Sequence, residues 1–308
     1  MVYDLTIIGG GPAGVGAGVY AARKQLRTLF ITKEWGGQSV VSPDIQNWIG
    51  IPSIPGEKLA VELKKHLETY AGDVVDIKEG LNATEIKPKE GGFIVKTEDG
   101  TSYESKTVLL TNGAVRRKLP APGAEEFDQK GLTYCATCDG PLFTGLDVVV
   151  VGGGNAGFET AAQLLQYTKS VTLLEHMDKF MADPITVKKV LEHPNMKAMT
   201  NTDITEVYGE GTVKGVKIKN NQTGEEGNIA CGGVFVEIGL VPNTEIVKDL
   251  VTLDKRNHIE VNPLSQRTSL EGLWAAGDNT TGLYHQNNIA VGDAVKALED
   301  IYVYLHAS

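Results

Sequence analysis

The sequence contains the same glycine-rich pattern twice, and each copy lies between an apolar run and a helix-forming run. The first copy spans residues 5–18, LTIIGGGPAGVGAG, and the second spans residues 148–161, VVVVGGGNAGFETA. A second apolar run follows each copy, at Thr28–Thr32 and at Val171–Leu174. This order of strand, glycine turn, helix and strand is typical of dinucleotide-binding units. The copies are 143 residues apart, which is far too long for a solenoid repeat, so the pattern predicts two separate units.

The glycines of both copies follow the spacing Gly-x-Gly-x-x-Gly. The first glycine permits a tight turn, the second lets the backbone approach a pyrophosphate, and the third allows the helix to pack closely on the strand. The helix then presents free N–H groups and the positive end of its dipole to the phosphates. Such turns also join strands to helices for purely structural reasons, but the flanking elements favour binding. The positions are Gly9, Gly11, Gly14, Gly152, Gly154 and Gly157.

An acidic residue lies near the end of the second strand in each unit. Glu175 follows Gly152 by 23 residues, close to the distance at which an acid commonly binds a ribose 2′-hydroxyl. The acid of the first unit is less clear, because Glu34 follows Gly9 by 25 residues and Lys33 separates it from the strand. A solvated strand end is the alternative for Glu175. Two dinucleotide sites suggest a flavin and a nicotinamide, the simplest pair that exchanges a hydride or two electrons.

The sequence Cys135-Ala-Thr-Cys138-Asp139 lies between the two units. A zinc site needs about four ligands, and only Cys231 and scattered histidines remain, so we expect no metal. A structural pair of free thiols stays open. A redox pair fits best, because two intervening residues let a disulfide open and close with little backbone movement. A helix N-terminus near Cys138 would lower its pKa, Asp139 could carry a proton, and Cys231 is interpreted as a small buried hydrophobe.

Other segments predict further elements. Gly92–Thr97 and Ser102–Leu110 alternate as strands do, Ile259–Val261 predicts a short strand, and residues from about Asn288 predict a helix. A cluster of proline and glycine, Leu119–Gly123, indicates a domain crossing.

Composition excludes several other classes of protein. The 308 residues carry a net charge of −10 without a cluster of lysine or arginine, which argues against nucleic-acid binding. The sequence contains no run of about 18 apolar residues, so it predicts no membrane-spanning helix. Residues Met1–Asp4 lead into an apolar strand without the basic region of a secretory signal. Three cysteines do not form a disulfide scaffold. We therefore expect a cytoplasmic protein that binds neither nucleic acid nor membrane.

Together with further motifs, these patterns resemble the low-molecular-weight thioredoxin reductase family of bacteria and archaea over nearly the whole chain. The sequence is most similar to the catalytic part of the flavoprotein of the alkyl hydroperoxide reductase system, in Gly36–His66, Cys138–Phe143 and Val171–Glu175. That branch normally carries an extra N-terminal thioredoxin-like region, and this sequence starts at the first flavin strand. The resemblance rests on Gly9–Gly14, Gly36–Gln38, Asp44–Asn47, Cys135–Gly140, Gly152–Gly157, Ile238–Asn243 and Ala275–Asp278.

The resemblance implies an α/β fold with two Rossmann-like, three-layer dinucleotide-binding domains, the second inserted in the first. Residues 1–114 and 245–308 would form a discontinuous FAD-binding domain, and residues 115–244 an NAD(P)H-binding domain that carries the redox cysteines. It also implies a homodimer, and a domain rotation that presents the disulfide and the nicotinamide to the flavin in turn. The residues implied for FAD are Gly9, Gly11, Gly14, Glu34, Gln38, Asn47, Gly113, Gly277, Asp278 and Gln286; those for NADH are Gly152, Gly154, Gly157 and Glu175.

The sequence departs from the family where the 2′-phosphate of NADPH would bind. NADPH-using members have His-Arg-Arg-x-x-x-Arg after the second strand, and the matching residues here are Glu175, His176, Met177 and Met181. Two unit charges ~4 Å apart at an effective dielectric of ~20 interact by roughly 4 kcal/mol. Half of that, about 2 kcal/mol, favours NADH about thirtyfold. Two smaller departures are Asn112 in Thr-Asn-Gly, where Ala-Thr-Gly is common, and His285, where an arginine is common before Gln286.

The activity implied by the resemblance is that of an NADH-dependent disulfide reductase. Electrons would pass from NADH through FAD and the Cys135–Cys138 disulfide to a thioredoxin- or glutaredoxin-like protein. Cys138 would face the flavin, Cys135 would attack the partner, and Asp139 would assist proton transfer. Alternatives are a peroxiredoxin-linked reductase or NADH oxidase, a reductase with a donor such as ferredoxin, and a flavin-binding redox sensor without turnover.

Overall fold

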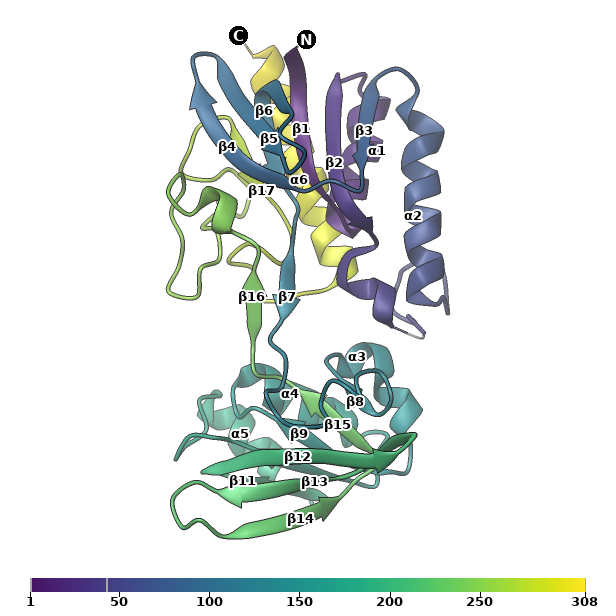
Figure 1. The fold of residues 1–308 in the computed structure, drawn as a ribbon, viewed down its shortest axis with the longest axis vertical. Coiled ribbons are helices and arrows are strands. Elements are labelled where there is room, and N and C mark those ends of the chain that lie inside the picture. Colours follow the sequence, from purple (N-terminus) through teal and green to yellow (C-terminus); the bar gives the residue numbers. More distant parts are fainter. Residues whose placement is uncertain (1, 43, 308) are drawn as a thin grey trace. The chain divides into compact units, whose positions relative to one another are not determined.

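The computed structural model of the chain describes residues 2–42 and 44–307, with the side chains of Thr137 and Cys138 outside that description. The chain forms two compact units of the α/β class (Figure 1). The first unit comprises Met1–Val41, Trp48–Val115 and Val241–Ser308, and the second comprises Ser42–Asn47 and Arg116–Leu240. The sequence-based boundaries assign residues 42–47 to the first domain, whereas in the structure they group with the second unit.

The first unit is built on a mainly parallel sheet with β1 at its centre. The strand order is β3-β2-β1-β6-β5-β4, and β17 pairs with β6. The pair β4–β5 is antiparallel, and β5 is antiparallel to β6. Helix α1 contacts both α2 and α6. The bounds are β1 Val2–Gly10, α1 Pro12–Arg23, β2 Thr28–Trp35, η1 Gly37–Val41, α2 Gly56–Ala71, β3 Val75–Glu79, β4 Ala83–Lys89, β5 Gly92–Thr97, β6 Ser102–Leu110, η3 Glu245–Val247, β17 Leu273–Ala275 and α6 Asn287–His306.

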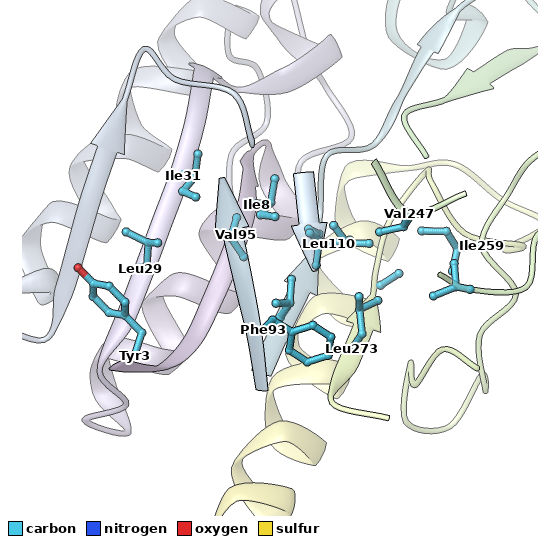
Figure 2. Close-up of a cluster of buried hydrophobic side chains, with 14 residues drawn as sticks. Tyr3, Ile8, Leu29, Ile31, Phe93, Val95, Leu110, Val247, Ile259 and Leu273 are labelled. Atoms are coloured by element: carbon cyan, nitrogen blue, oxygen red, sulfur yellow. The ribbon is translucent and has the colours of Figure 1, made fainter. Parts of the chain in front are cut away.

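One apolar cluster joins the two sequence-distant parts of the first unit. Ile8 of β1, Leu110 of β6 and Phe93 of β5 pack with Val247 and Ile259, which lie more than a hundred residues later in the chain (Figure 2). Ile259 and Leu110 are completely buried. Burial of this cluster is what makes a discontinuous stretch of chain fold as one body.

The second unit is a three-layer arrangement around a parallel sheet of order β11-β10-β9-β15-β8. Val148 and Val150 of β9 face a cluster with Phe158 of α4, while Val149 faces the antiparallel sheet β12-β13-β14 through Val216. This alternation is the two-residue period of a strand buried on both faces. The bounds are β8 Leu132–Thr133, α3 Ala136–Asp139, η2 Gly140–Phe143, β9 Asp147–Val151, α4 Asn155–Leu164, β10 Ser170–Leu174, α5 Pro184–Leu191, β11 Met196–Met199, β12 Thr202–Glu210, β13 Thr212–Asn220, β14 Glu226–Ala230 and β15 Gly233–Val236.

The fold class predicted from the sequence, two Rossmann-like units, is confirmed. The predicted strands Gly92–Thr97 and Ser102–Leu110 are β5 and β6, and the predicted C-terminal helix is α6. The predicted strand Ile259–Val261 is wrong, since Ile259 forms only isolated bridges, to Leu253 and Thr280. The chain passes between the units after residues 41 and 47, and again in the paired strands β7, Ala114–Arg116, and β16, Leu240–Pro242.

The two glycine turns have the same backbone construction. Gly9 and Gly152 open them with φ of 119° and 115°, values that favour glycine over every other residue. A Cβ added to Gly14 would lie 1.8 Å from the carbonyl oxygen of Gly9, and one added to Gly157 would lie 1.8 Å from that of Gly152. The third glycine of each motif is therefore required for helix–strand packing.

Gly157→Ala is expected to destabilise the second unit by about 3 kcal/mol or more, because the added methyl group meets a backbone oxygen that cannot yield. Gly154→Ala is the matched control, since a Cβ there meets nothing within 4 Å, and its cost should stay below about 1 kcal/mol. Chemical denaturation followed by circular dichroism measures both. Equal losses in the two variants would contradict the packing argument.

Candidate functional site

A cavity of about 580 Å³ opens in the first unit beside the turn that follows β1. Its volume lies in the range of roughly 300–1,000 Å³ that is usual for cofactor sites. A Cβ on Gly11 would find only the Cα of Gly37 nearby, at 3.9 Å, so the bare backbone of this turn is open to a ligand. Of the residues predicted for FAD, those that line the cavity are Gly9, Gly11, Glu34, Gln38, Gly113, Gly277 and Asp278.

Three residues predicted for FAD do not line this cavity. Gly14 lies behind the turn, where it packs on the carbonyl of Gly9. Gln286 is the N-cap residue of α6, and the neighbouring Asn287 does line the cavity. Asn47 belongs to the segment that groups with the second unit.

The lining of the cavity includes two polar residues that the sequence reasoning missed. Lys33 and Asn82 line it together with Glu34. Glu98 holds both, because Lys33 Nζ donates to Oε1 at 2.5 Å and Asn82 Nδ2 donates to Oε2 at 3.2 Å. Asn82 follows β3 in a loop, and nothing local in the sequence distinguishes it.

The two smaller departures of the sequence have defined contacts. The Nδ2 of Asn112 donates to the carbonyl of Asn243 at 2.5 Å, and the Nδ2 of Asn243 donates to the carbonyl of Asn112 at 2.7 Å. His285 Nδ1 lies 3.4 Å from the Oδ1 of Asp278, and its ring stacks on His258 with 6.2 Å between centroids. His285 therefore contacts a cavity-lining carboxylate.

Glu175 lies against the glycine turn of the second unit. Its side chain is buried, its Oε2 accepts a hydrogen bond from Gly153 N at 2.5 Å, and its Oε1 accepts one from Met177 N at 2.8 Å. A Cβ on Gly153 would lie 2.7 Å from Oε2, so this middle glycine, which the sequence reasoning did not single out, makes room for the carboxylate. The negative charge is fixed at the end of β10, where the ribose of a dinucleotide binds in this fold.

The segment after Glu175 folds back onto the same turn. Met181 N and Ala182 N donate to the carbonyl of Gly153, at 2.9 Å and 3.2 Å. The ring of Phe180 packs edge-on against Phe158, with 5.1 Å between centroids. Met181 is largely exposed, and residues 175–183 contain no arginine. This segment thus offers no guanidinium to a 2′-phosphate.

A second buried carboxyl group, that of Glu237, lies beside the turn. Its backbone oxygen would be 2.3 Å from a Cβ on Gly152. Its Oε1 accepts from Thr160 Oγ1 at 3.0 Å and its Oε2 pairs with Arg116 Nη1 at 3.3 Å. Burial raises the pKa of Glu237, while Arg116 and Thr160 oppose that rise. The sequence reasoning missed this group, which had no local signal.

The cysteines differ sharply in environment. Cys135 is disulfide-bonded and partly exposed. The side chain of Cys138 lies outside the described residues, so its pairing with Cys135 stays a prediction. Cys231 is free and buried, and burial raises its pKa to about 12, as expected for a small hydrophobe.

Asp139 lies on α3 and is 4% exposed. Its carboxyl group accepts hydrogen bonds from Thr133 Oγ1 and, at 3.4 Å, from Ser42 Oγ. Burial raises the pKa of this carboxyl group, and the two hydroxyl groups oppose the rise. A carboxyl group in such an environment holds its proton to a higher pH than an exposed one and can deliver it to a nearby thiolate.

Within the described residues, no group of three or more His, Cys, Asp or Glu side chains is arranged to hold a metal ion. In the same part of the chain, no helix combines the length and the apolar character that crossing a membrane requires.

Known proteins resemble this chain over nearly its whole length. The family described as pyridine nucleotide-disulphide oxidoreductase matches residues 3–294. The F subunit of alkyl hydroperoxide reductase in Pseudomonas putida is 41% identical over 297 residues, which cover 96% of this chain and 56% of that protein. NADH dehydrogenase of Bacillus subtilis (strain 168) is 39% identical over 303 residues, which cover 98% of this chain and 58% of that protein.

The chain thus spans less than two thirds of the length of these curated relatives. Among solved structures, thioredoxin reductase from Streptococcus pyogenes MGAS5005 matches with a TM-score of 0.89 and 36% identity. That match covers 100% of this chain and 99% of the other.

Asp139→Asn is expected to raise the melting temperature at neutral pH. Because the folded-state pKa of Asp139 is raised, the folded protein binds more protons than the unfolded one above the ordinary pKa of aspartate. Stability is therefore lost as the pH rises through the folded-state value. Calorimetry of both proteins over a pH series checks this, with the exposed Asp73→Asn as control. A gain that grows toward acid pH would contradict the sign.

Proposed function

Because the chain belongs to the pyridine nucleotide-disulphide oxidoreductase family, in the low-molecular-weight thioredoxin reductase branch near the alkyl hydroperoxide reductase flavoproteins, we propose that it is an NADH-dependent flavoprotein disulfide reductase. The observation that carries the proposal is a combination within the second unit. That unit holds a disulfide-bonded Cys135 close in sequence to the buried Asp139, and a dinucleotide-type turn with Glu175 fixed against it. A reductase of this kind needs both a nucleotide site and a redox disulfide.

The cavity of the first unit is the proposed FAD site. Gly9 and Gly11 would present the backbone to the pyrophosphate, since the φ of 119° at Gly9 favours glycine and Gly11 lines the cavity without a side chain. Glu34 would accept from ribose hydroxyl groups, and Asp278, contacted by His285, from the ribityl part. Bound there, FAD would supply the two-electron step between the nicotinamide and the disulfide.

Glu175 supports NADH rather than NADPH as the donor. Its carboxylate is held by two backbone N–H groups, and each oxygen retains a lone pair for a ribose hydroxyl group. A 2′-phosphate at that place would meet the fixed negative charge instead.

We propose that this chain acts as a homodimer in the cytoplasm. Its proposed acceptor is a thioredoxin- or glutaredoxin-like protein. The partly exposed Cys135 would attack the partner disulfide, and Asp139 would protonate the thiolate that leaves. The solved relative named thioredoxin reductase supports this acceptor.

A second candidate differs in the acceptor only. Relatives named NADH dehydrogenase and alkyl hydroperoxide reductase favour an oxidase or a peroxiredoxin-linked reductase. Rapid consumption of NADH in air, without any added thioredoxin, would favour that function. A ferredoxin donor finds less support, because the turn at Gly152–Gly157 keeps its glycines.

Anaerobic titration of the FAD-loaded protein tests the donor. NADH should bleach the flavin at a concentration about thirtyfold lower than NADPH, as expected for roughly 2 kcal/mol of repulsion at Glu175. Glu175→Ala should lower this ratio between the NADPH and NADH concentrations that bleach the flavin. The melting temperature of this variant is recorded as well, because two backbone N–H groups lose their acceptor. Bleaching by neither nucleotide would overturn the nicotinamide donor.

Cys135→Ser should lower the rate at which a protein disulfide is reduced by at least about a hundredfold, because the attacking sulfur is lost. Bleaching of the flavin by NADH should remain. Cys231→Ser is the matched control, since that thiol is buried and free, and it should retain activity. A Cys135→Ser protein that still reduces thioredoxin would refute the assigned role.

A further inference from the structure

Two hydroxyl groups from distant parts of the chain converge on Asp139. Thr133 ends β8, six residues before Asp139, and its Oγ1 donates to Oδ2 of the carboxyl group. Ser42 comes from 97 residues earlier, and its Oγ donates to Oδ1 at 3.4 Å. Asp139 and Thr133 are both nearly inaccessible to solvent. Within the described residues, both hydrogen-bond donors to Asp139 are uncharged.

The two hydroxyl groups are not equivalent donors. The backbone N–H of Cys135 donates to Thr133 Oγ1 at 3.4 Å. Because Thr133 Oγ1 accepts there, its single proton remains for Asp139. Ser42 Oγ lies 3.3 Å from the carbonyl of Asp44 and 3.4 Å from Asp139, so its one proton is shared between two acceptors. Thr133 is therefore the stronger donor, and it also links Asp139 to the backbone of the redox cysteine.

Titratable groups on neighbouring elements are few. Cys135 precedes α3, and α4, which contacts α3, carries the exposed Glu159. Tyr167 lies near Gly140, and Asp44 belongs to the segment of Ser42. Element η2, which also contacts α3, carries none. Among the described residues, the two hydroxyl groups are thus the side-chain contacts through which this chain can tune Asp139.

Resting on the proposed function, we propose that Thr133 is a positioning residue for Asp139, with Ser42 as a weaker second donor. Its hydroxyl group sets the pH range over which Asp139 can protonate a leaving thiolate. When the Cys135 thiolate attacks a disulfide, the S–S bond breaks and one sulfur leaves as a thiolate, which takes the proton of Asp139. As the second thiol of the pair attacks Cys135 in the mixed disulfide, its proton passes to the Asp139 carboxylate. The second leaving thiolate is protonated by solvent, the dithiol is oxidised, and the partner disulfide is reduced.

The test uses the FAD-loaded protein reduced with dithiothreitol and freed of the reductant, so that no nicotinamide step enters. Single-turnover reoxidation is followed over a pH series with two probes. Hydroxyethyl disulfide releases a basic thiolate that needs a proton. Dithiodipyridine releases a weakly basic pyridinethiolate that needs no proton at sulfur and takes one from solvent at its ring nitrogen to become the thione, so it controls for any effect on the attacking sulfur.

With hydroxyethyl disulfide, Thr133→Val should move the inflection at which Asp139 loses its proton upward by about one pH unit, the change expected for losing one hydrogen bond to a carboxylate. Ser42→Ala should move it less, and Thr133→Ser, which keeps the hydroxyl group, should restore the wild-type profile. Asp139→Asn should remove the inflection. With dithiodipyridine, the profiles of Thr133→Val and wild type should coincide.

Two results would overturn the proposal. One is a wild-type profile for Thr133→Val with hydroxyethyl disulfide. The other is an equal shift with both probes, which would assign Thr133 to the attacking sulfur or to folding. A wild-type protein that reacts with neither probe would refute the proposed function itself. If NADH failed to bleach the flavin, by contrast, the nicotinamide donor would be refuted but the conclusion about Thr133 would still hold.

Discussion

The close approach of helix to strand in each glycine turn is the constraint on which both units depend. A side chain on the third glycine would lie 1.8 Å from the carbonyl of the first, at Gly14 as at Gly157, so neither helix can be placed as it is with any other residue. The turns differ in the residue that begins each helix. Helix α1 begins at Pro12. Proline has no backbone N–H, and at the start of a helix that N–H would have no partner within the helix. Helix α4 begins at Asn155, whose side chain accepts from Asp183 N at 2.8 Å and so ties the segment after Glu175 to the turn.

Three carboxyl groups are buried in the part of the second unit that the structure describes, and each has a different set of hydrogen-bond donors. Glu175 is held by backbone N–H groups, which fix its position beside the nucleotide turn. Glu237 is paired with the guanidinium of Arg116 and a hydroxyl group, as a buried charge requires. Asp139 has only hydroxyl groups as described donors. Of these three groups, Asp139 is the one that is buried, has no cationic partner among the described residues and lies close in sequence to Cys135. A proton donor to sulfur needs this combination.

The sequence predicted the parts of this molecule whose determinants are local. Glycine spacing and the acid after the second strand located both turns and Glu175, since strand, turn and helix are consecutive in the chain. The partners of those residues could not be predicted in the same way. Asn82, Glu237 and Ser42 reach their places through pairing and packing of distant segments, and no local pattern marks them. The predicted strand at Ile259–Val261 failed for a local reason: Asn262 and Pro263 follow at once, and Asn262 N bonds to Arg267 O in a turn instead of extending a ladder.

The residues proposed for donor choice and for thiol chemistry follow different strands of one sheet. In the order β11-β10-β9-β15-β8, Glu175 follows β10 and Asp139 follows β8. Three strand spacings of ~4.8 Å separate these strands by roughly 14 Å, too far for direct contact. A substitution at Glu175 that changed the nucleotide would leave the hydroxyl groups around Asp139 untouched, and the reverse holds. Under the proposed function, a change of electron donor at Glu175 would therefore leave the thiol chemistry at Asp139 in place.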